Sequence, residues 1–503
     1  MNDNLILLPI ILQLALALVL LFFWSRTKWQ RIGSIVGNAA FLLVSIVLFI
    51  KVKQEGILYT QAGGWDAPYG ITFVVDLFSA SMLVITALSG LAVSIFAAGS
   101  MSRRRSLFVF FPIYHFLLMG ISGSFVAGDL FNLYVWFELI IVASFGLITL
   151  GGGRRQLEGA LKYVTLNLIA SILFLTGIAF LYGLTGTLNM AHIAQKIPQI
   201  ENEGLITVTA LMFFIGLGIK TAVFPMYFWL PASYHTPLSA ISAIFGGLLT
   251  KVGVYALFRV FSLFFLPDSF TATVITAVAA LTLIMGAMGA LIQKDVRKLF
   301  SWLIVCHIGF MIAGLGIYSS VALAGAIFYL FHDIIVKTNL FMISGLVHKL
   351  KGTFKLKKLG GLYTQYPKIT FLIAIPLFSL VGIPPLSGFW PKLLLIQGGL
   401  EVQEYLIIGA IVLGSFVTLA TIAKFWLEVI WKEPPESDYP KYFIPFSQLN
   451  WIQKAYYTLP IAILAVVSLY FAFGVEFMVN IVNQIAYDLM NPEEYIRVIL
   501  PDQ

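Results

Sequence analysis

The sequence predicts an all-α membrane protein, a bundle of fourteen transmembrane helices that forms a single domain over residues 1–503. The first observation is composition: 60% of the residues are hydrophobic, 11% are charged and the mean hydropathy is +0.94. A soluble domain with this composition could not cover its surface with polar groups. The second observation is that apolar stretches of about 20 residues, the length that spans a bilayer, recur along the chain. Helices are expected because lipid requires closed hydrogen bonding and the stretches lack the alternation of a barrel.

The apolar stretches follow one another with short polar connections. They begin near residues 5, 33, 72, 108, 130, 162, 205, 238, 270, 299, 321, 370, 405 and 456. The first has no basic residue before it and Arg26, Lys28 and Arg31 after it, the reverse of a secretory signal, so we expect it to remain as the first span. The longest polar stretches, such as 349–368 and 432–454, are too short to build a soluble core.

The basic residues outside these stretches lie mostly in loops of one parity. Four fall in the other loops, namely Lys51, Lys53, Lys196 and Arg497. The positive-inside rule therefore predicts cytoplasmic basic loops, both termini outside, and a multi-pass protein of the cell membrane. The pattern argues against nucleic-acid binding, which a net charge of +8 alone could have indicated. The twenty basic residues of the first set are Arg26, Lys28, Arg31, Arg103, Arg104, Arg105, Arg154, Arg155, Lys294, Arg297, Lys298, Lys349, Lys351, Lys355, Lys357, Lys358, Lys368, Lys432, Lys441 and Lys454.

No metal or redox cofactor is expected. The chain has a single cysteine, Cys306, which excludes an internal disulfide. It has no CxxC pair and no histidine-rich spacing of the kind that binds a metal or haem. The chemistry must therefore come from ordinary side chains within the bundle.

Two apolar stretches are interrupted by proline in comparable places of the two halves. Residues 216–231 read GLGIKTAVFPMYFWLP and contain Pro225, and residues 380–396 read LVGIPPLSGFWPKLLLI and contain Pro384 and Pro385. Paired broken hydrophobic segments are typical of transporters built from inverted repeats. We expect each to be a broken helix that lines an ion path.

Several ionisable residues remain inside the predicted spans. A charge at the centre of a bilayer costs about 2.5 kcal/mol or more, so a group of them indicates a shared function. The acids at this depth are chiefly Glu138 and Asp333, with Glu428 one turn after a lysine. The basic residues are Lys162, Lys220, Lys251, Arg259, Lys337, Lys392 and Lys424.

Glu138 and Lys220 have two interpretations. They could form a structural ion pair that holds two helices together, although buried pairs contribute little net stability. Alternatively they could be proton-coupled, because burial disfavours the charged ammonium whereas a nearby carboxylate favours it. In that case movement of Glu138 would decide whether Lys220 holds its proton.

Three further lysines could continue such a path. Lys251 follows the small residues of FGGLLTKVGVY, and the alternative is a lysine that extends to the membrane surface. Lys337 and Lys392 lie in the middle of separate spans. Each of these lysines could hold and release a proton within the bundle.

Buried histidines and acids near the span ends rank below the lysines. His332 and His307 could relay protons or could be satisfied hydrogen-bonding groups. His115, Asp76 and Asp129 lie near predicted span ends, where water can solvate them, and rank lower still.

Four motifs carry a resemblance that covers nearly the whole chain. They are GDLFNLYVWFEL, GIKTAVFPMYFWLPASYHTPLSAISAIFGGLLTKVGVYALFRV, QKDVRKLFSWLIVCHIGF and GIPPLSGFWPK. Together they resemble the antiporter-like subunits shared by respiratory complex I and the Mrp-type multisubunit cation/proton antiporters. Within this family, the stretch GGWDAPYGITFVVDLFSA and the length of 503 residues are similar to the shorter of the two large Mrp subunits.

The resemblance implies a fold with two inverted five-helix repeats, spans 4 to 8 over residues 108–262 and spans 9 to 13 over residues 270–431, each with a broken helix. It also implies a proton path, in which Glu138, Lys220, Lys251 and Lys392 match the acid of span 5 and the charged residues of spans 7, 8 and 12. Span 11 departs from the family pattern, which leaves its relay open between His332, Asp333 and Lys337.

These inferences predict a secondary transporter subunit and not an enzyme. It would move H⁺ in exchange for Na⁺, or for K⁺ or Li⁺, within a hetero-oligomeric complex of Mrp-type subunits in the lipid bilayer. One alternative is a proton-pumping subunit of complex I or of a membrane-bound hydrogenase, which shares all these motifs. Another is a non-conducting scaffold, which the cost of so many buried charges disfavours.

Overall fold

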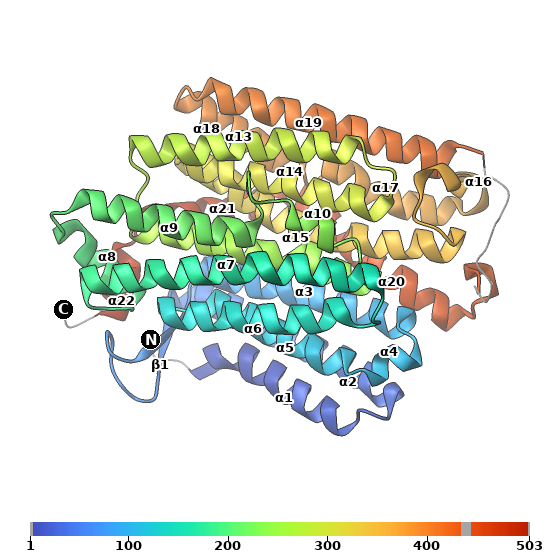
Figure 1. The fold of residues 1–503 in the computed structure, drawn as a ribbon, viewed down its shortest axis with the longest axis horizontal. Helices are drawn as coiled ribbons and strands as arrows, with labels where there is room; N and C mark the ends of the chain where they lie inside the picture. The colour runs from blue at the N-terminus through green and yellow to red at the C-terminus, as the bar shows by residue number, and fades with distance from the viewer. Residues whose placement is uncertain (1–3, 434–443, 501–503) are drawn as a thin grey trace.

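The protein is a bundle of long, roughly parallel helices with a small two-stranded sheet at one end (Figure 1). This computed structural model describes residues 4–433 and 444–500, and Lys441 of the predicted basic loops lies outside them. Twelve helices within the described residues are long and apolar enough to cross a membrane. The stretches expected from residues 108 and 370 form shorter apolar helices, so the number fourteen stays a prediction.

The N-terminal part contributes three long helices and the sheet. Its elements are η1 Asn4–Leu7, α1 Leu8–Phe22, α2 Thr27–Glu55, β1 Leu58–Ala62, β2 Ile71–Val75, α3 Leu77–Ser100 and α4 Arg103–Leu107. Strands β1 and β2 pair antiparallel, with Leu58 opposite Val75. The sequence places the start of the third span near residue 72, but the β-branched and aromatic run before Asp76 forms β2 instead.

The middle of the chain forms five apolar spans, the fourth of which is interrupted. Its elements are α5 Phe110–Val126, α6 Leu130–Thr149, α7 Arg154–Thr185, α8 Met190–Lys196, η2 Ile197–Gln199, α9 Glu203–Thr221, α10 Trp229–Ser233, α11 Ser239–Ile244, the π-helical segment η3 Phe245–Leu249 and α12 Thr250–Leu263.

The next part has the same order of long helices. Its elements are α13 Ser269–Leu291, α14 Val296–Ile317, α15 Ser320–Lys351, η4 Leu356–Lys358, α16 Leu362–Gln365, α17 Pro367–Val381, α18 Phe389–Glu401, α19 Tyr405–Trp426 and the π-helical segment η5 Leu427–Trp431. The C-terminal elements are η6 Phe446–Gln448, α20 Trp451–Phe473, α21 Val475–Met490 and α22 Glu493–Ile499.

The two proline-containing stretches are both interrupted helices, and the interruptions match. In the first break α9 ends at Thr221 and α10 begins at Trp229; in the second, α17 ends at Val381 and α18 begins at Phe389. Each helix is followed by a residue in the left-handed region, Ala222 with φ of 67° and Gly382 with φ of 87°. This conformation turns the chain away from the helix axis and leaves carbonyl groups at the helix end without helical partners.

Several helices begin immediately after an aspartate. The carboxylates of Asp76, Asp129, Asp268 and Asp295 accept backbone N–H groups at the starts of α3, α6, α13 and α14. Such caps satisfy donors that the helix itself cannot pair. These four acids therefore have a local structural role.

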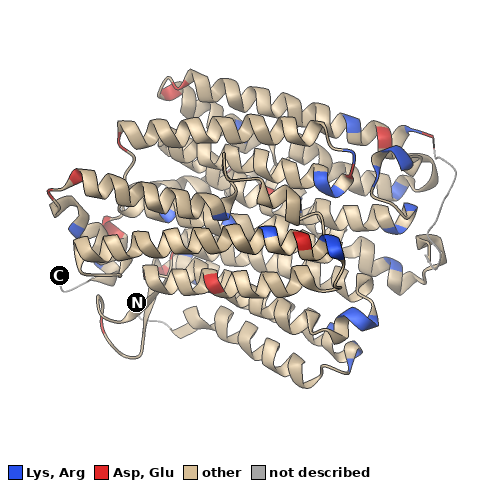
Figure 2. Ribbon diagram, in the orientation of Figure 1, with Lys and Arg blue, Asp and Glu red and all other residues tan. Residues whose placement is uncertain are grey.

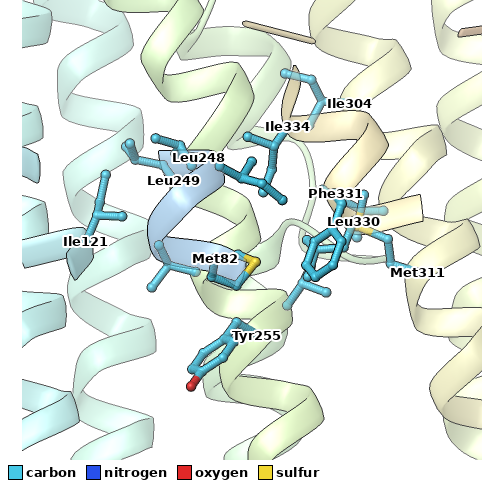
Figure 3. Packing of buried hydrophobic residues seen from close by; sticks show 14 of the residues in the cluster. Met82, Ile121, Leu248, Leu249, Tyr255, Ile304, Met311, Leu330, Phe331 and Ile334 are labelled. Atoms are coloured by element: carbon cyan, nitrogen blue, oxygen red, sulfur yellow. The ribbon is translucent and has the colours of Figure 1, made fainter. Parts of the chain in front are cut away.

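The centre of the bundle consists of α3, α12, α14 and α15. These helices are buried along most of their length, whereas α1, α2, α7 and α19 keep large exposed apolar faces. Figure 3 shows the packing of this centre, where Met82 of α3 lies near Leu248, Phe331 and Ile334. A charged group on a central helix is therefore surrounded by protein and not by lipid.

Candidate functional site

Lys220 lies in the last turn of α9, directly before the first break. Its side chain is 5% exposed, and its ammonium donates a hydrogen bond to Ser171 Oγ of α7 at 2.9 Å. The ammonium also lies 4.9 Å from the centre of the Phe137 ring of α6, a distance suited to a cation–π interaction. Lys220 is thus stabilised by a hydroxyl group and an aromatic face.

Glu138 follows Phe137 on α6 but makes no ion pair with Lys220. Among the described residues no ion pair within 4.0 Å involves Glu138, and its Oε1 atom is buried without a hydrogen-bond partner. The interpretation as a structural ion pair is therefore not what this structure contains. A movement of one side chain would be needed to bring the two charges into contact.

A small cavity of about 20 Å³ adjoins the Lys220 side chain. Besides Lys220, it is lined by Phe137, Tyr163, Asn167, Trp229 and other residues of α6, α7 and the first break. A volume of this size accommodates about one water molecule when polar partners are present. Trp229 also donates from Nε1 to the Ile219 carbonyl at 2.9 Å, which satisfies one group freed by the break.

Lys251 lies in the centre of the bundle and forms an ion pair there. It is completely buried in the first turn of α12, where its Nζ lies 2.8 Å from Asp333 Oδ2 of α15 and donates to the Gly246 carbonyl at 2.7 Å. The Asp333 side chain is also completely buried. The lysine does not extend to the membrane surface, so that alternative from the sequence is wrong.

Asp333 connects Lys251 to two further groups. Its Oδ1 lies 3.0 Å from His307 Nδ1 of α14 and 4.0 Å from Lys337 Nζ, one turn later on α15. Within the described part of the chain, neither Lys337 Nζ nor His307 Nε2 has a hydrogen-bond partner. One carboxylate therefore faces two lysines and a histidine, a cluster with more basic groups than acids.

His332 takes a different direction from its neighbour Asp333. Its Nδ1 lies 2.9 Å from the hydroxyl of Ser387 in the second break, and this hydroxyl lies 2.9 Å from Ser468 of α20. Adjacent residues of a helix project about 100° apart, which explains why the two side chains reach different neighbours. The predicted relay of span 11 is thus divided between two faces of α15.

Lys392 lies in the first turn of α18, directly after the second break. Its ammonium donates to the Val381 carbonyl at 2.7 Å and to the Leu380 carbonyl at 3.4 Å, at the end of α17. It also lies 5.1 Å from the Phe310 ring centre, and that ring stacks on Tyr329 at 4.8 Å. The carbonyl groups freed by the second break therefore solvate this lysine.

The predicted path residues thus fall into separate environments. The structure brings Lys251 and Lys337 together around one carboxylate. It places His332 at the second break, beside the segment that carries Lys392. It leaves Glu138 apart from the lysine that the sequence pairs with it.

Two members of the central cluster were not among the preferred residues of the sequence prediction. Asp333 was one of three open choices in span 11, and His307 ranked below the lysines, yet the carboxylate joins the whole cluster. The spacing of Asp333 and Lys337 by four residues was the available signal, since it puts both on one helix face.

Two residues that the sequence places near span ends are instead buried in polar networks. The Asp76 carboxylate pairs with Arg259 of α12, which also donates from Nε to the Tyr255 hydroxyl at 3.0 Å. His115 lies between Gln13 Oε1 at 2.6 Å and Ser34 Oγ at 2.9 Å, which joins α5 to α1 and α2. Both networks satisfy their members and hold helices together.

Comparisons with known proteins agree with this arrangement. The family described as "NADH:quinone oxidoreductase/Mrp antiporter, TM" matches residues 127–418. The chain is 40% identical to a Na⁺/H⁺ antiporter subunit, the one named D, of Alkalihalophilus pseudofirmus, and 39% identical to its namesake in Bacillus subtilis, over 99% of this chain and 100% of each relative. A chain in the structure of the Mrp complex from a Dietzia species has the same fold, with a TM-score of 0.90 and 27% identity over 99% of this chain and 100% of that chain.

The resemblance expected from the four sequence motifs is confirmed, including its similarity to the shorter large subunit of the Mrp branch. The matched family region contains both breaks and every predicted path residue. The chain belongs to the NADH:quinone oxidoreductase/Mrp antiporter family of membrane subunits.

Proposed function

We propose that this chain is the proton-translocating subunit of a multisubunit Na⁺/H⁺ antiporter. The relatives that match over their full length are named Na⁺/H⁺ antiporter subunits, which favours this function over a subunit of a redox complex. The observation that carries the proposal is the set of buried ionisable groups on α9, α12, α14, α15 and α18, all inside the bundle. Groups of this kind mark proton paths in membrane proteins.

Lys220 is the point at which proton release is controlled. In the described arrangement its ammonium is held by Ser171 and Phe137. Burial disfavours this charge and a nearby carboxylate favours it, so the distance to Glu138 decides whether Lys220 keeps its proton. When Glu138 approaches, Lys220 is charged; when it withdraws, Lys220 passes its proton to water in the adjoining cavity.

The proton then moves toward the central cluster. Helix α12 packs closely on α9, because a Cβ atom at Gly253 would lie only 2.7 Å from the Thr221 side chain. Lys251 receives the proton and Asp333 balances its charge, after which Lys337 and His307 offer neighbouring acceptors. The next basic group along the bundle is the lysine of α18, solvated by carbonyl groups of the second break.

We also propose the two inverted repeats, residues 108–262 and 270–431, and an orientation with both termini outside. The matching interruptions at 222–228 and 382–388 support the repeats. Figure 2 shows most lysines and arginines at one end of the bundle and both termini at the other, which supports the orientation through the positive-inside rule. The chain acts as a transporter subunit without catalytic residues of its own.

The proposal is tested by Na⁺-dependent proton flux in inverted vesicles that contain the assembled complex. We expect Glu138→Gln and Lys220→Ala each to abolish the flux while the complex still assembles. Normal antiport in either variant would contradict the proposal. The scaffold alternative is tested by Lys392→Met, for which a changed yield of complex with unchanged flux would favour a purely structural role.

A further inference from the structure

A large cavity of about 1010 Å³ lies at the end of the bundle that is rich in basic residues (Figure 2). Three parts of the chain enclose it: the start of α7, the first break with the segment after it, and the connection from α13 to α14. Two lysines near η4, Lys355 and Lys357, complete the wall. None of the residues of the proposed proton path lines this cavity.

The charge of this cavity is strongly positive. Its two carboxylates are already engaged, because Glu158 pairs with Lys162 at 2.6 Å and Asp295 accepts backbone N–H groups at the start of α14. The buried Nε of Arg297 has no hydrogen-bond partner in the part of the chain that the structure describes. An anionic ligand is therefore required to balance the site. The seven basic residues of the lining are Arg155, Lys162, Lys294, Arg297, Lys298, Lys355 and Lys357.

The lining also contains apolar groups that a soluble anion would not need. Phe228 is 58% exposed and Ile292 is 69% exposed, and the half-buried ring of Trp302 lies beside them. Exposed apolar side chains at the end of a transmembrane bundle face lipid, and tryptophan favours the level of the headgroups. Basic pockets between transmembrane helices on the cytoplasmic side are suited to phospholipid headgroups.

We propose that this cavity binds the phosphodiester headgroup of an anionic phospholipid from the adjacent leaflet. The basic side chains pair with the phosphate, and the first methylene groups of the acyl chains pack on Phe228, Ile292 and Trp302. Pro231 and His235 form part of the lining, so the headgroup rests on the segment that follows the first break. The binding itself does not depend on the proposed proton path.

The test measures quenching of Trp302 fluorescence in the assembled complex, reconstituted in neutral phosphatidylcholine with a small fraction of brominated lipid. Subtraction of the signal of a Trp302→Phe complex isolates this tryptophan. We expect brominated phosphatidylglycerol to quench Trp302 more strongly than brominated phosphatidylcholine. Each basic residue near an anionic lipid contributes about fivefold in binding, so the triple variant R155Q/K294Q/K298Q should weaken this preference on the order of 100-fold.

The matched control removes three charges on the same side of the bundle but outside the cavity. The triple variant R103Q/R104Q/R105Q alters α4 and should keep the preference for phosphatidylglycerol. Equal quenching by the two brominated lipids in the native complex would overturn the proposal, as would an equal loss in both triple variants. Displacement of the lipid by millimolar inorganic phosphate would identify a site for soluble anions and would also overturn it.

Discussion

Lys220 and Lys251 are buried cations on neighbouring helices, yet their charges are balanced differently. Lys251 pairs with Asp333 at 2.8 Å in a completely buried site. Lys220 has a hydroxyl group and an aromatic ring as partners, and the carboxylate of Glu138 remains outside ion-pair distance. The difference teaches that a buried lysine with a fixed carboxylate is held in its charged form, whereas one beside a carboxylate that can approach or withdraw is suited to release its proton.

The largest effect is expected at Asp333. Asp333→Asn removes the negative charge that Lys251, Lys337 and His307 share, and an uncompensated buried charge costs about 3–5 kcal/mol. We therefore expect a complex that unfolds at lower temperature or denaturant and has no Na⁺-dependent proton flux. Thermal unfolding of the purified complex measures the first effect. A variant as stable as the native complex would show that the two sites do not differ as described.

The double variant Lys251→Met/Asp333→Leu sharpens this interpretation. Replacement of both members of a buried pair by apolar residues of similar size is often neutral or stabilising. We expect most of the lost thermal stability to return, although Lys337 and His307 still lie beside the changed position. Proton flux should stay absent, because the basic group of α12 is gone. Recovery of flux together with stability would exclude Lys251 from the path.

Lys220→Met should separate transport from stability. The lysine has no ion-pair partner among the described residues, so its removal leaves no carboxylate without its partner. We expect the unfolding free energy to change by less than about 1 kcal/mol, in contrast to Asp333→Asn, because no buried charge becomes uncompensated. The proton flux should nevertheless be lost. A large loss of stability would mean that Lys220 is a structural cation like Lys251.

The smallest effect is expected at Ser171. Ser171→Ala removes the hydroxyl that accepts from Lys220, and a hydrogen bond to a charged group contributes about 1.5–3 kcal/mol. We expect a reduction of the initial rate of antiport by about tenfold, without loss of assembly. The control is Ser171→Thr, which keeps a hydroxyl at this position and should retain most of the rate. An unchanged rate in the alanine variant would show that this hydrogen bond does not hold the ammonium.

The sequence predicted the helical membrane fold and the two interruptions well, because hydropathy and proline act locally. It also selected Lys220, Lys251, Lys337 and Lys392, each of which the structure places inside the bundle. The position of β2 was missed, since a short run of β-branched residues before a span has the same hydropathy as the span itself. Local physics therefore determined most of what could be predicted.

The partners of these charges could not be predicted in the same way. Lys251 and Asp333 lie on helices far apart in the sequence, and hydropathy does not specify which faces of two helices meet. Glu138 and Lys220 were expected to be close, but the residue that meets the ammonium is Phe137, one position earlier on α6. A shift of one residue rotates a helical side chain by about 100°, which is enough to replace a carboxylate by a ring.

The most direct test of proton release at Lys220 is Na⁺-dependent proton flux in inverted vesicles that contain the Lys220→Arg complex. Arginine keeps the positive charge and can make the same contacts with Ser171 and Phe137, but its guanidinium does not release a proton under physiological conditions. We expect a fully assembled complex without flux. Native rates of antiport in this variant would contradict the claim that Lys220 must lose its proton.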